Sequence, residues 1–369
     1  MGRNLSKLAL ALGIFAAVFV TSGGRVATDL VETTAGRVYA SPDCASAWWE
    51  QGQGTAGLTI YSLASHAESL NVYAGVWDEG VYRAVSGENS WWQTPSLGAS
   101  IKISSLTIDP VSPNIVYAGT MGNGIFRSAN GGDIWDATTG LEGKDVWSLA
   151  ITSTATSMYA YAGAEGGEIY TSTNGIDWDL AGGTEIGTEK FYALTVDPQD
   201  SKTTYVGTKE KGVYRTTAGG LTWTLSGLDE KTVRGLAIHP GDRDIIYAGT
   251  QSHGIFKSTN GGASWLPGRL DGRDVLAIAI NARNPEFIYA GTYGDGVWLS
   301  YDGGYSWHRM PGLTGGASYV YSLTLFTPKG EDDCQVLYAG TTDGVWARTV
   351  MPLYTAYLPL VCKGYPAGQ

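Results

Sequence analysis

The octapeptide STNGGASW, residues 258–265, packs a serine, an amide, two glycines and a tryptophan into a stretch far too short to be a domain. Related segments recur as SANGGDIW (128–135), TTAGGLTW (216–223) and SYDGGYSW (300–307), and more loosely as SGENSWW (86–92) and STNGIDW (172–178). The series ends on Trp92, Trp135, Trp178, Trp223, Trp265 and Trp307, at intervals of 43, 43, 45, 42 and 42 residues. A fixed period of this size is typical of repeat arrays, including solenoids and propellers.

Each repeat has the pattern of four β-strands. In residues 104–140 the alternating run SSLTID is followed by the β-rich runs NIVYAGT, GIFRSA and IWDATT, with turns rich in Gly and Asn between the later runs. Tyr-(Ala/Val)-Gly marks the second run in seven units, at Tyr73, Tyr117, Tyr161, Tyr205, Tyr247, Tyr289 and Tyr338. Four-stranded units of this length are typical of propeller blades. We therefore predict an all-β, seven-bladed β-propeller of four-stranded antiparallel blades.

The first run of every unit carries small residues at alternate positions. It is seen as YSLA (61–64), SSLT (104–107), WSLA (147–150), YALT (192–195), RGLA (234–237), LAIA (276–279) and YSLT (321–324). The second and fourth positions are always Ser, Ala, Gly or Thr. Small side chains suit strands that crowd together around a central axis, so we expect this run to be the innermost strand.

The two ends of the array predict how the ring closes. The seventh unit stops at GVWARTV (344–350) without reaching a tryptophan motif, so it lacks a fourth strand. Near the other end, Trp49 lies 14 residues before Leu63, as Trp92 lies 14 residues before Leu106. We expect the segment around 47–51 to be the outer strand that completes the last blade, which removes an open sheet edge.

The N-terminal segment has the layout of a secretory signal. Arg3 and Lys7 precede the apolar run LALALGIFAAVFV (8–20), and small residues follow it. The run is too short for a comfortable transmembrane helix. We predict a signal peptide or uncleaved N-terminal anchor at 1–24, a linker at 25–43, the propeller at 44–350 and a C-terminal tail at 351–369. The protein is then exported, to the extracellular space, the periplasm or the cell surface.

Composition limits the partners and cofactors. The net charge of −11 argues against nucleic acid and anionic lipid as partners. None of the three cysteines forms a C-x-x-C pair, and Cys44 and Cys362 flank the array, so a disulfide between them is one option in an exported chain. No metal-ligand spacing links the four histidines. We expect a monomer without metal or cofactor.

The tryptophan motifs resemble the Asp-box, or BNR repeat, of sialidases, xyloglucan-degrading endoglucanases, sortilin-type receptors and photosystem II stability/assembly factors. The resemblance covers about residues 45–350 and implies that each box is a turn between the third and fourth strands, away from the ligand face. Structural roles then fall to Asn130, Trp135, Asn174, Trp178, Trp223, Asn260, Trp265, Asp302 and Trp307. Ala218 replaces the acid or amide in the fourth unit, which a catalytic carboxylate would not tolerate. Calcium binding at these turns is a minor alternative.

The same resemblance implies a ligand face built from the second-to-third-strand turns and the loops between units. The candidate binding residues there are Asp78, Glu79, Trp147, Glu165, Tyr192, Arg234, His253, Asp295, Tyr321 and Asp343. Together they suggest an acidic funnel with an aromatic rim, suited to a sugar chain or a cationic peptide. The structural alternative is that the loop charges are simply solvated.

Two classes of function fit these residues. The favoured one is an exported, non-catalytic propeller that binds a protein or glycan partner, as the single-propeller size of the photosystem II factors implies. The alternative is a glycoside hydrolase, which needs two loop carboxylates roughly 5 to 9.5 Å apart. The sequence shows no sialidase-like arginine cluster, and it is long enough for one propeller where the related endoglucanases carry two. We assign no catalytic residue.

Overall fold

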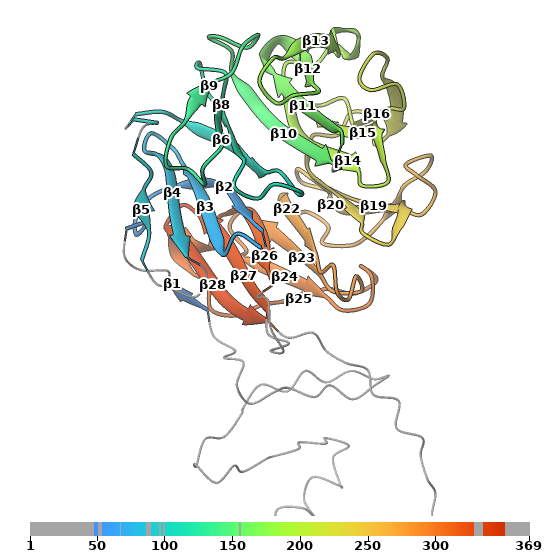
Figure 1. Ribbon diagram of the computed structural model, residues 1–369. Helices are drawn as coiled ribbons and strands as arrows, with labels where there is room; N and C mark the ends of the chain where they lie inside the picture. The colour runs from blue at the N-terminus through green and yellow to red at the C-terminus, as the bar shows by residue number, and fades with distance from the viewer. Residues whose placement is uncertain are drawn as a thin grey trace, which may run out of the picture.

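A computed structural model describes residues 48–50, 54–66, 68–85, 90–95, 97–98, 100–154, 156–327 and 335–350. These residues form seven four-stranded antiparallel sheets arranged in a ring (Figure 1). The first strands of successive blades contact one another, and the first strand of the last blade contacts that of the first blade. The predicted all-β, seven-bladed propeller is therefore confirmed.

The strands follow the blades in chain order. The first three blades are β2 (Ile60–Ser65), β3 (Asn71–Val76), β4 (Gly80–Val85) and β5 (Trp92–Gln93); β6 (Ile103–Ile108), β7 (Val116–Thr120), β8 (Ile125–Ser128) and β9 (Asp136–Ala137); and β10 (Val146–Ser153), β11 (Met158–Ala164), β12 (Ile169–Ser172) and β13 (Asp179–Gly182). The fourth and fifth are β14 (Phe191–Asp197), β15 (Asp200–Thr208), β16 (Val213–Thr216) and β17 (Thr224–Gly227); and β18 (Val233–His239), β19 (Asp242–Thr250), β20 (Gly254–Ser258) and β21 (Leu266–Pro267). The last two are β22 (Val275–Ile280), β23 (Ile288–Thr292), β24 (Val297–Ser300) and β25 (His308–Arg309); and β26 (Val320–Phe326), β27 (Gln335–Thr341), β28 (Gly344–Val350) and β1 (Trp49–Glu50). Three 3₁₀ turns, η1 (Glu165–Gly167), η2 (Thr184–Ile186) and η3 (Gly315–Ser318), lie in the connections.

The ring closes by a strand from the N-terminal side, as predicted. β1 pairs antiparallel with β28, with Trp49 opposite Ala347 and Glu50 opposite Trp346. Figure 1 shows β1 beside β28 at the edge of the seventh blade. The last sheet therefore has four strands like the others, and the outer edge of β28 is not left open.

The tryptophan register in two units differs from the one that spacing predicted. Trp91 is buried with 5% of its surface exposed, whereas Trp92 is 37% exposed. Trp91 directly precedes β5, as Trp135 directly precedes β9. Trp48 likewise precedes β1 and is 8% exposed. Where two tryptophans are adjacent, the first of them is the one buried between blades. The length of the repeat varies by a few residues between units, so spacing alone could not identify the buried tryptophan.

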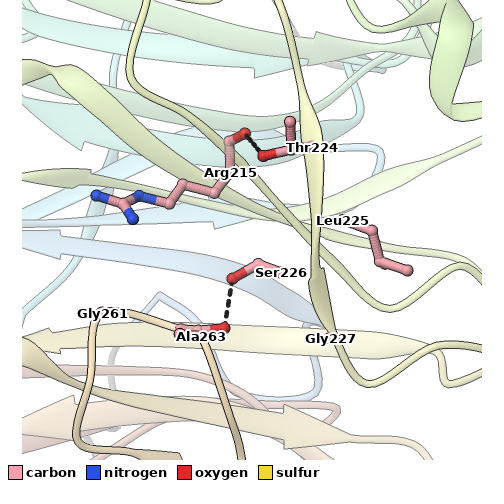
Figure 2. A pocket seen from close by; sticks show the side chains of 8 residues that line it. Arg215, Thr224, Leu225, Ser226, Gly227, Gly261 and Ala263 are labelled. Carbon is pink, nitrogen blue, oxygen red and sulfur yellow. Dashed lines mark hydrogen bonds between the residues drawn. The ribbon is translucent and has the colours of Figure 1, made fainter.

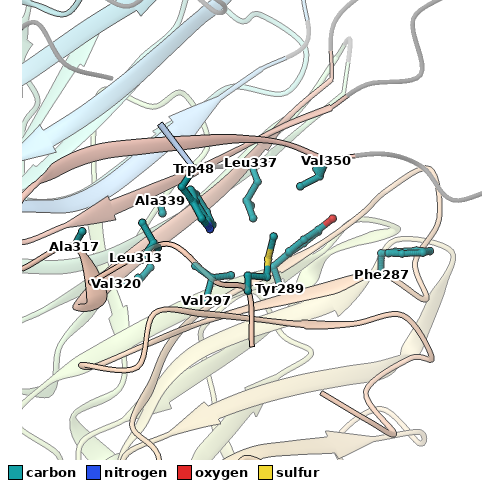
Figure 3. Close-up of a cluster of buried hydrophobic side chains, with 11 residues drawn as sticks. Trp48, Phe287, Tyr289, Val297, Leu313, Ala317, Val320, Leu337, Ala339 and Val350 are labelled. Carbon is teal, nitrogen blue, oxygen red and sulfur yellow. The ribbon is translucent and has the colours of Figure 1, made fainter. Parts of the chain in front are cut away.

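The hydrophobic core lies between neighbouring blades. Figure 3 shows the cluster between the sixth and seventh blades, where Trp48 packs with Leu313, Val320 and Ala339. The tyrosine that marks the second strand of each unit is almost fully buried in all seven blades. In the fourth blade its phenol also reaches the next blade, because Tyr205 Oη donates a hydrogen bond to the Gly261 carbonyl oxygen at 2.9 Å.

The connections between strands lie on two opposite faces of the ring. On one face the tryptophan-motif turns contact the turns between the first and second strands, as where the Gly131 amide donates to the Asn114 carbonyl at 2.8 Å. On the other, the second-to-third-strand turns contact the loops that enter the first strands, as where the Gly124 amide donates to the Lys144 carbonyl at 3.0 Å. Gly124 has a φ of 70°, and a Cβ there would lie 2.3 Å from the Leu141 carbonyl oxygen, so the close approach requires glycine. We call this second face the loop face.

Candidate functional site: a central cavity on the loop face

A cavity of about 570 Å³ lies where the seven innermost strands begin. Every blade contributes the residue that precedes the first small residue of its innermost strand: Tyr61, Ser104, Trp147, Tyr192, Arg234, Leu276 and Tyr321. The cavity is therefore built symmetrically from the repeat, but the side chain at this position varies among Tyr, Ser, Trp, Arg and Leu. Its volume is within the range of small-ligand sites.

A β-bulge places each of these seven residues. The pairing of the first two strands shifts register between Ile60 and Ser62 in the first blade, so that Tyr61 is the extra residue. The equivalent shift falls on the lining residue in each of the other six blades. A bulge leaves one residue unpaired and re-aims its side chain, and bulges are frequent beside active sites. The seven bulges explain why one side chain per blade lines the cavity.

Other lining residues come from the adjacent connections. Trp77, Met121, Gln251 and Tyr293 occupy the position directly after the second strand of their blades. Lys190 and Asp274 directly precede the innermost strands β14 and β22. Sequence reasoning did not single out Trp77, Met121, Lys190, Gln251 or Tyr293 as site residues. The second position after the Tyr-(Ala/Val)-Gly run in each unit would have been the signal for four of them.

One wall of the cavity is aromatic. The Tyr61 and Tyr321 rings stack with centroids 4.7 Å apart, and the Trp77 ring centroid lies 4.6 Å from that of Tyr61. Tyr293 meets the Tyr321 ring edge-on at 6.2 Å. Burial, followed by the neighbouring phenols of Tyr61 and Tyr293, raises the pKa of Tyr321 to about 12. The Tyr321 phenol is therefore neutral at physiological pH and able to donate a hydrogen bond.

A second wall, from the third to the fifth blade, combines aromatic rings with cations. Lys190 Nζ lies 4.0 Å from the Trp147 ring centroid, and the Arg234 guanidinium carbon lies 4.0 Å from the Tyr192 centroid. Trp147 and Tyr192 also meet edge-on at 6.0 Å. Trp147 Nε1 and Arg234 Nε are buried without a hydrogen-bond partner in the described part of the chain. This wall thus offers unused donors beside two positive charges.

The cavity differs from the acidic funnel that the sequence suggested. Asp274 is the single carboxylate among the described residues that line the cavity, and it accepts hydrogen bonds from the Ser252 amide at 2.7 Å and hydroxyl at 3.1 Å. Acidic residues of the outer turns form ion pairs instead. Asp295 contacts Arg273 at 2.7 Å and Arg309 at 3.4 Å. The sequence located the turns correctly but could not show which side chains reach the axis.

The ten predicted binding residues divide into two groups. Four of them line the cavity: Trp147, Tyr192, Arg234 and Tyr321. The other six, Asp78, Glu79, Glu165, His253, Asp295 and Asp343, lie on the loop face in or beside the second-to-third-strand turns, outside the cavity lining. Asp78 lies 3.6 Å from the Lys102 ammonium, which fits a charge-pairing role at the surface.

The residues predicted to be structural lie in turns on the opposite face. In the fifth blade, Asn260 Oδ1 accepts hydrogen bonds from the Ser264 amide at 2.9 Å and the Ser258 hydroxyl at 3.0 Å. Equivalent bonds are made by Asn130, Asn174 and Asp302, and Trp135, Trp178, Trp223, Trp265 and Trp307 follow the turns. In the fourth blade Thr216 Oγ1 still accepts from the Gly220 amide, while Ala218 has no acceptor to offer.

A second pocket of about 370 Å³ lies at the seam between the fourth and fifth blades, on the outer side of the ring (Figure 2). It is lined by Arg215, Thr224, Leu225, Ser226, Gly227, Gly261, Gly262 and Ala263. The Ser226 hydroxyl crosses the seam and donates to the Gly262 carbonyl at 2.8 Å. Glycines, short side chains and a hydrogen bond between blades make this pocket a feature of blade packing.

Several predictions fall on residues outside the description. These are the segments 1–24, 25–43 and 351–369 and the cysteines Cys44 and Cys362. Among the residues that are described, no group of three His, Cys, Asp or Glu side chains could hold a metal ion. The same residues include no helix long and apolar enough to cross a membrane.

Fold and cavity together define a closed seven-bladed propeller with a central site on one face. The structure is similar to a GH74 enzyme from Niastella koreensis, with a TM-score of 0.63 at 16% identity, covering 81% of this chain and 53% of that one. It is also similar to YCF48 bound to a D1 peptide, with a TM-score of 0.61 at 16% identity, covering 85% of this chain and 100% of that one. A GH74 xyloglucanase from Xanthomonas campestris gives a TM-score of 0.56 at 16% identity, covering 78% and 51%.

These similarities establish the fold. The chain spans about half the length of either GH74 enzyme and the whole length of YCF48. No family model matches the sequence, and no curated protein matches it. The resemblance to xyloglucanase and photosystem II assembly-factor propellers is thus confirmed as a resemblance of architecture.

Proposed function

We propose that this protein is an exported, non-catalytic propeller that binds a protein or glycan partner through its loop face. The observation that carries the proposal is the ring of seven bulged residues, one from each blade, which places five kinds of side chain around a single cavity. A structural core would be expected to repeat the same residue in each blade, as the buried tyrosines do. Variation at a repeated, re-aimed position is what a binding site on a repeat scaffold requires.

The chemistry of the lining supports binding over hydrolysis. Glycoside hydrolysis commonly uses two carboxyl groups on either side of the scissile bond, about 5 to 9.5 Å apart. The described residues of the lining supply one carboxylate, that of Asp274, and it is already hydrogen-bonded to Ser252. The aromatic rings and unused donors of the cavity suit recognition of a ligand without bond cleavage.

A glycoside hydrolase is the second candidate. Two of the similar propellers are GH74 enzymes, and the loop face carries further carboxylates in its turns, including Asp78 and Asp295. In this alternative one of these residues would act together with Asp274. Their ion pairs with Lys102 and with Arg273 and Arg309 favour a structural role instead.

The two functions can be separated with one panel of ligands. The purified protein would be offered β-glucans, xyloglucan and sialylated glycans, with bound ligand and released reducing sugar measured in parallel. We expect no release of sugar, and we expect Tyr61→Ala to weaken whatever binding is found. Tyr305→Ala is the control, because Tyr305 is 71% exposed in a turn on the opposite face. Release of sugar that is lost in Asp274→Asn or Asp295→Asn would instead establish the hydrolase.

A further inference from the structure

The charge of the cavity is opposite to that of the chain. The protein has a net charge of −11, yet the described lining of the cavity contains Lys190 and Arg234 against one carboxylate, that of Asp274. Asp274 is occupied by two hydrogen bonds from Ser252. A cationic cavity attracts an anionic ligand, even where the protein as a whole carries a net negative charge.

The two cations also differ from five basic residues of the surrounding loop face. Lys102, Lys144, Lys209, Arg273 and Arg309 on the loop face each contact a carboxylate within 3.6 Å. In the described chain neither Lys190 nor Arg234 has such a partner. Each instead lies on an aromatic face, and Arg234 Nε is buried without an acceptor. Burying a charged donor without an acceptor is costly, so the arrangement is suited to an acceptor that arrives with the ligand.

The opposite wall requires a different property of the same ligand. Tyr61, Tyr321 and Trp77 form a continuous aromatic surface, and Tyr293 and Gln251 add a phenol and an amide. This wall suits a ligand with flat apolar faces and many hydroxyl groups. A peptide strand can be held through main-chain hydrogen bonds to a sheet edge, whereas the polar groups just described belong to side chains.

We propose that the central cavity binds an oligosaccharide of uronic acids, with its carboxylates at Lys190 and Arg234 and its sugar rings on Tyr61 and Tyr321. The proposal rests on the binding function proposed above and names the chemical class of its ligand. The flat faces of the sugar rings pack on the aromatic wall, and the carboxylates supply the hydrogen-bond acceptors that the cationic wall lacks.

The test uses trigalacturonic acid and its methyl ester as a matched pair, with binding measured by titration calorimetry on the purified full chain. Esterification keeps the rings and hydroxyls but removes the charges. We expect the acid to bind about ten- to a hundredfold more tightly than the ester, as expected for the loss of one hydrogen bond between charged groups. The preference should shrink as salt is added, because the charges are partly exposed to solvent.

Substitutions in each wall test which part of the ligand that wall binds. Lys190→Gln and Arg234→Gln should reduce binding of the acid to the level of the ester, while Tyr61→Ala should weaken both ligands. Lys211→Gln is the control, because Lys211 is an exposed residue of the same face that lies outside the cavity lining. The comparison of acid with ester uses the unmodified protein, so it stands even if a variant folds poorly.

Two results would overturn the proposal, and a third would overturn the non-catalytic function on which it rests. Equal binding of acid and ester would remove the role of the cations. Absence of binding to trigalacturonic acid would reject the ligand class, and hexaglutamate binding that depends on Arg234 would then assign an acidic peptide while leaving the proposed binding function intact. Conversely, cleavage of trigalacturonic acid would keep the ligand class and reject the non-catalytic function.

Discussion

Tyr247 Oη donates a hydrogen bond of 2.9 Å to the carbonyl oxygen of Gly303, which belongs to the tryptophan-motif turn of the next blade. Lys257 Nζ donates to the same oxygen at 2.8 Å. In the preceding blade Tyr205 makes the equivalent bond to the Gly261 carbonyl oxygen. Among the residues that the structure describes, no second side chain donates a hydrogen bond to that oxygen. The same contact between blades is thus doubly supported at one seam and singly supported at the next.

This difference predicts unequal effects for the same substitution. Tyr205→Phe should lower the free energy of unfolding by about 1–2 kcal/mol, because it leaves the buried Gly261 carbonyl without its donor. Tyr247→Phe should cost less, since Lys257 still donates to Gly303. Urea unfolding of both variants measures the difference. Equal losses would show that the lysine does not compensate.

The corrected tryptophan register predicts a second contrast. Trp48→Ala should cost about 3–5 kcal/mol, because it removes a large side chain from the core between the sixth and seventh blades. Trp92→Ala should cost less than about 1 kcal/mol, because Trp92 is 37% exposed beside its buried neighbour Trp91. Thermal unfolding of the two variants provides the comparison. A larger loss for Trp92→Ala would support the register predicted from spacing.

The irregular turn of the fourth blade predicts a stabilising change. Ala218 occupies the position at which Asn260 accepts the amide of the residue four positions later, Ser264. Ala218→Asn should therefore raise the free energy of unfolding by about 0.5–1.5 kcal/mol, by supplying an acceptor for the Thr222 amide. Binding at the cavity should not change, since this turn lies on the opposite face. Asn260→Ala is the reciprocal variant and should destabilise by a similar amount.

Asp302 predicts a dependence of stability on pH. Burial acts to raise its pKa, but hydrogen bonds from the Ser306 hydroxyl and amide and from Ser300 outweigh burial, so the pKa is lowered. A carboxyl with a lowered pKa stabilises the fold above its ordinary value of about 3.9, and this contribution is lost as the pH falls through the folded-state pKa. Asp302→Asn should accordingly be less stable than the unmodified protein at pH 7. The gap should narrow when urea unfolding is repeated near pH 3; a gap that does not change with pH would contradict the assignment.

Much of the fold could be predicted because the repeat is encoded locally. The alternating runs, the glycine turns and the seven buried tyrosines each specify a strand or a turn from a few adjacent residues. The missing fourth strand of the last unit predicted the pairing of β1 with β28, because an unpaired edge must be covered. Where the local signal was ambiguous, as in the pairs Trp48–Trp49 and Trp91–Trp92, spacing selected the wrong residue.

The candidate site was only partly predictable. Sequence reasoning found the loop face, and it found Trp147, Tyr192, Arg234 and Tyr321, because they precede a recognisable small residue on the innermost strand. It also favoured acidic turn residues that form ion pairs at the surface, such as Asp295. The cationic residue Lys190 directly precedes the innermost strand β14, as Asp274 precedes β22, but the residue type at this position varies between units and did not mark it as a site.

The sequence by itself determined the blade count, the strand order and the closure of the ring, since these depend on hydrophobic alternation and turn chemistry that each repeat carries within itself. Only the tertiary structure decided what the ring encloses. A bulge at the start of every innermost strand turns one side chain toward the axis, and residues from seven separate repeats meet there. The charge of that cavity is a property of residues brought together from distant repeats, so no single repeat contains it.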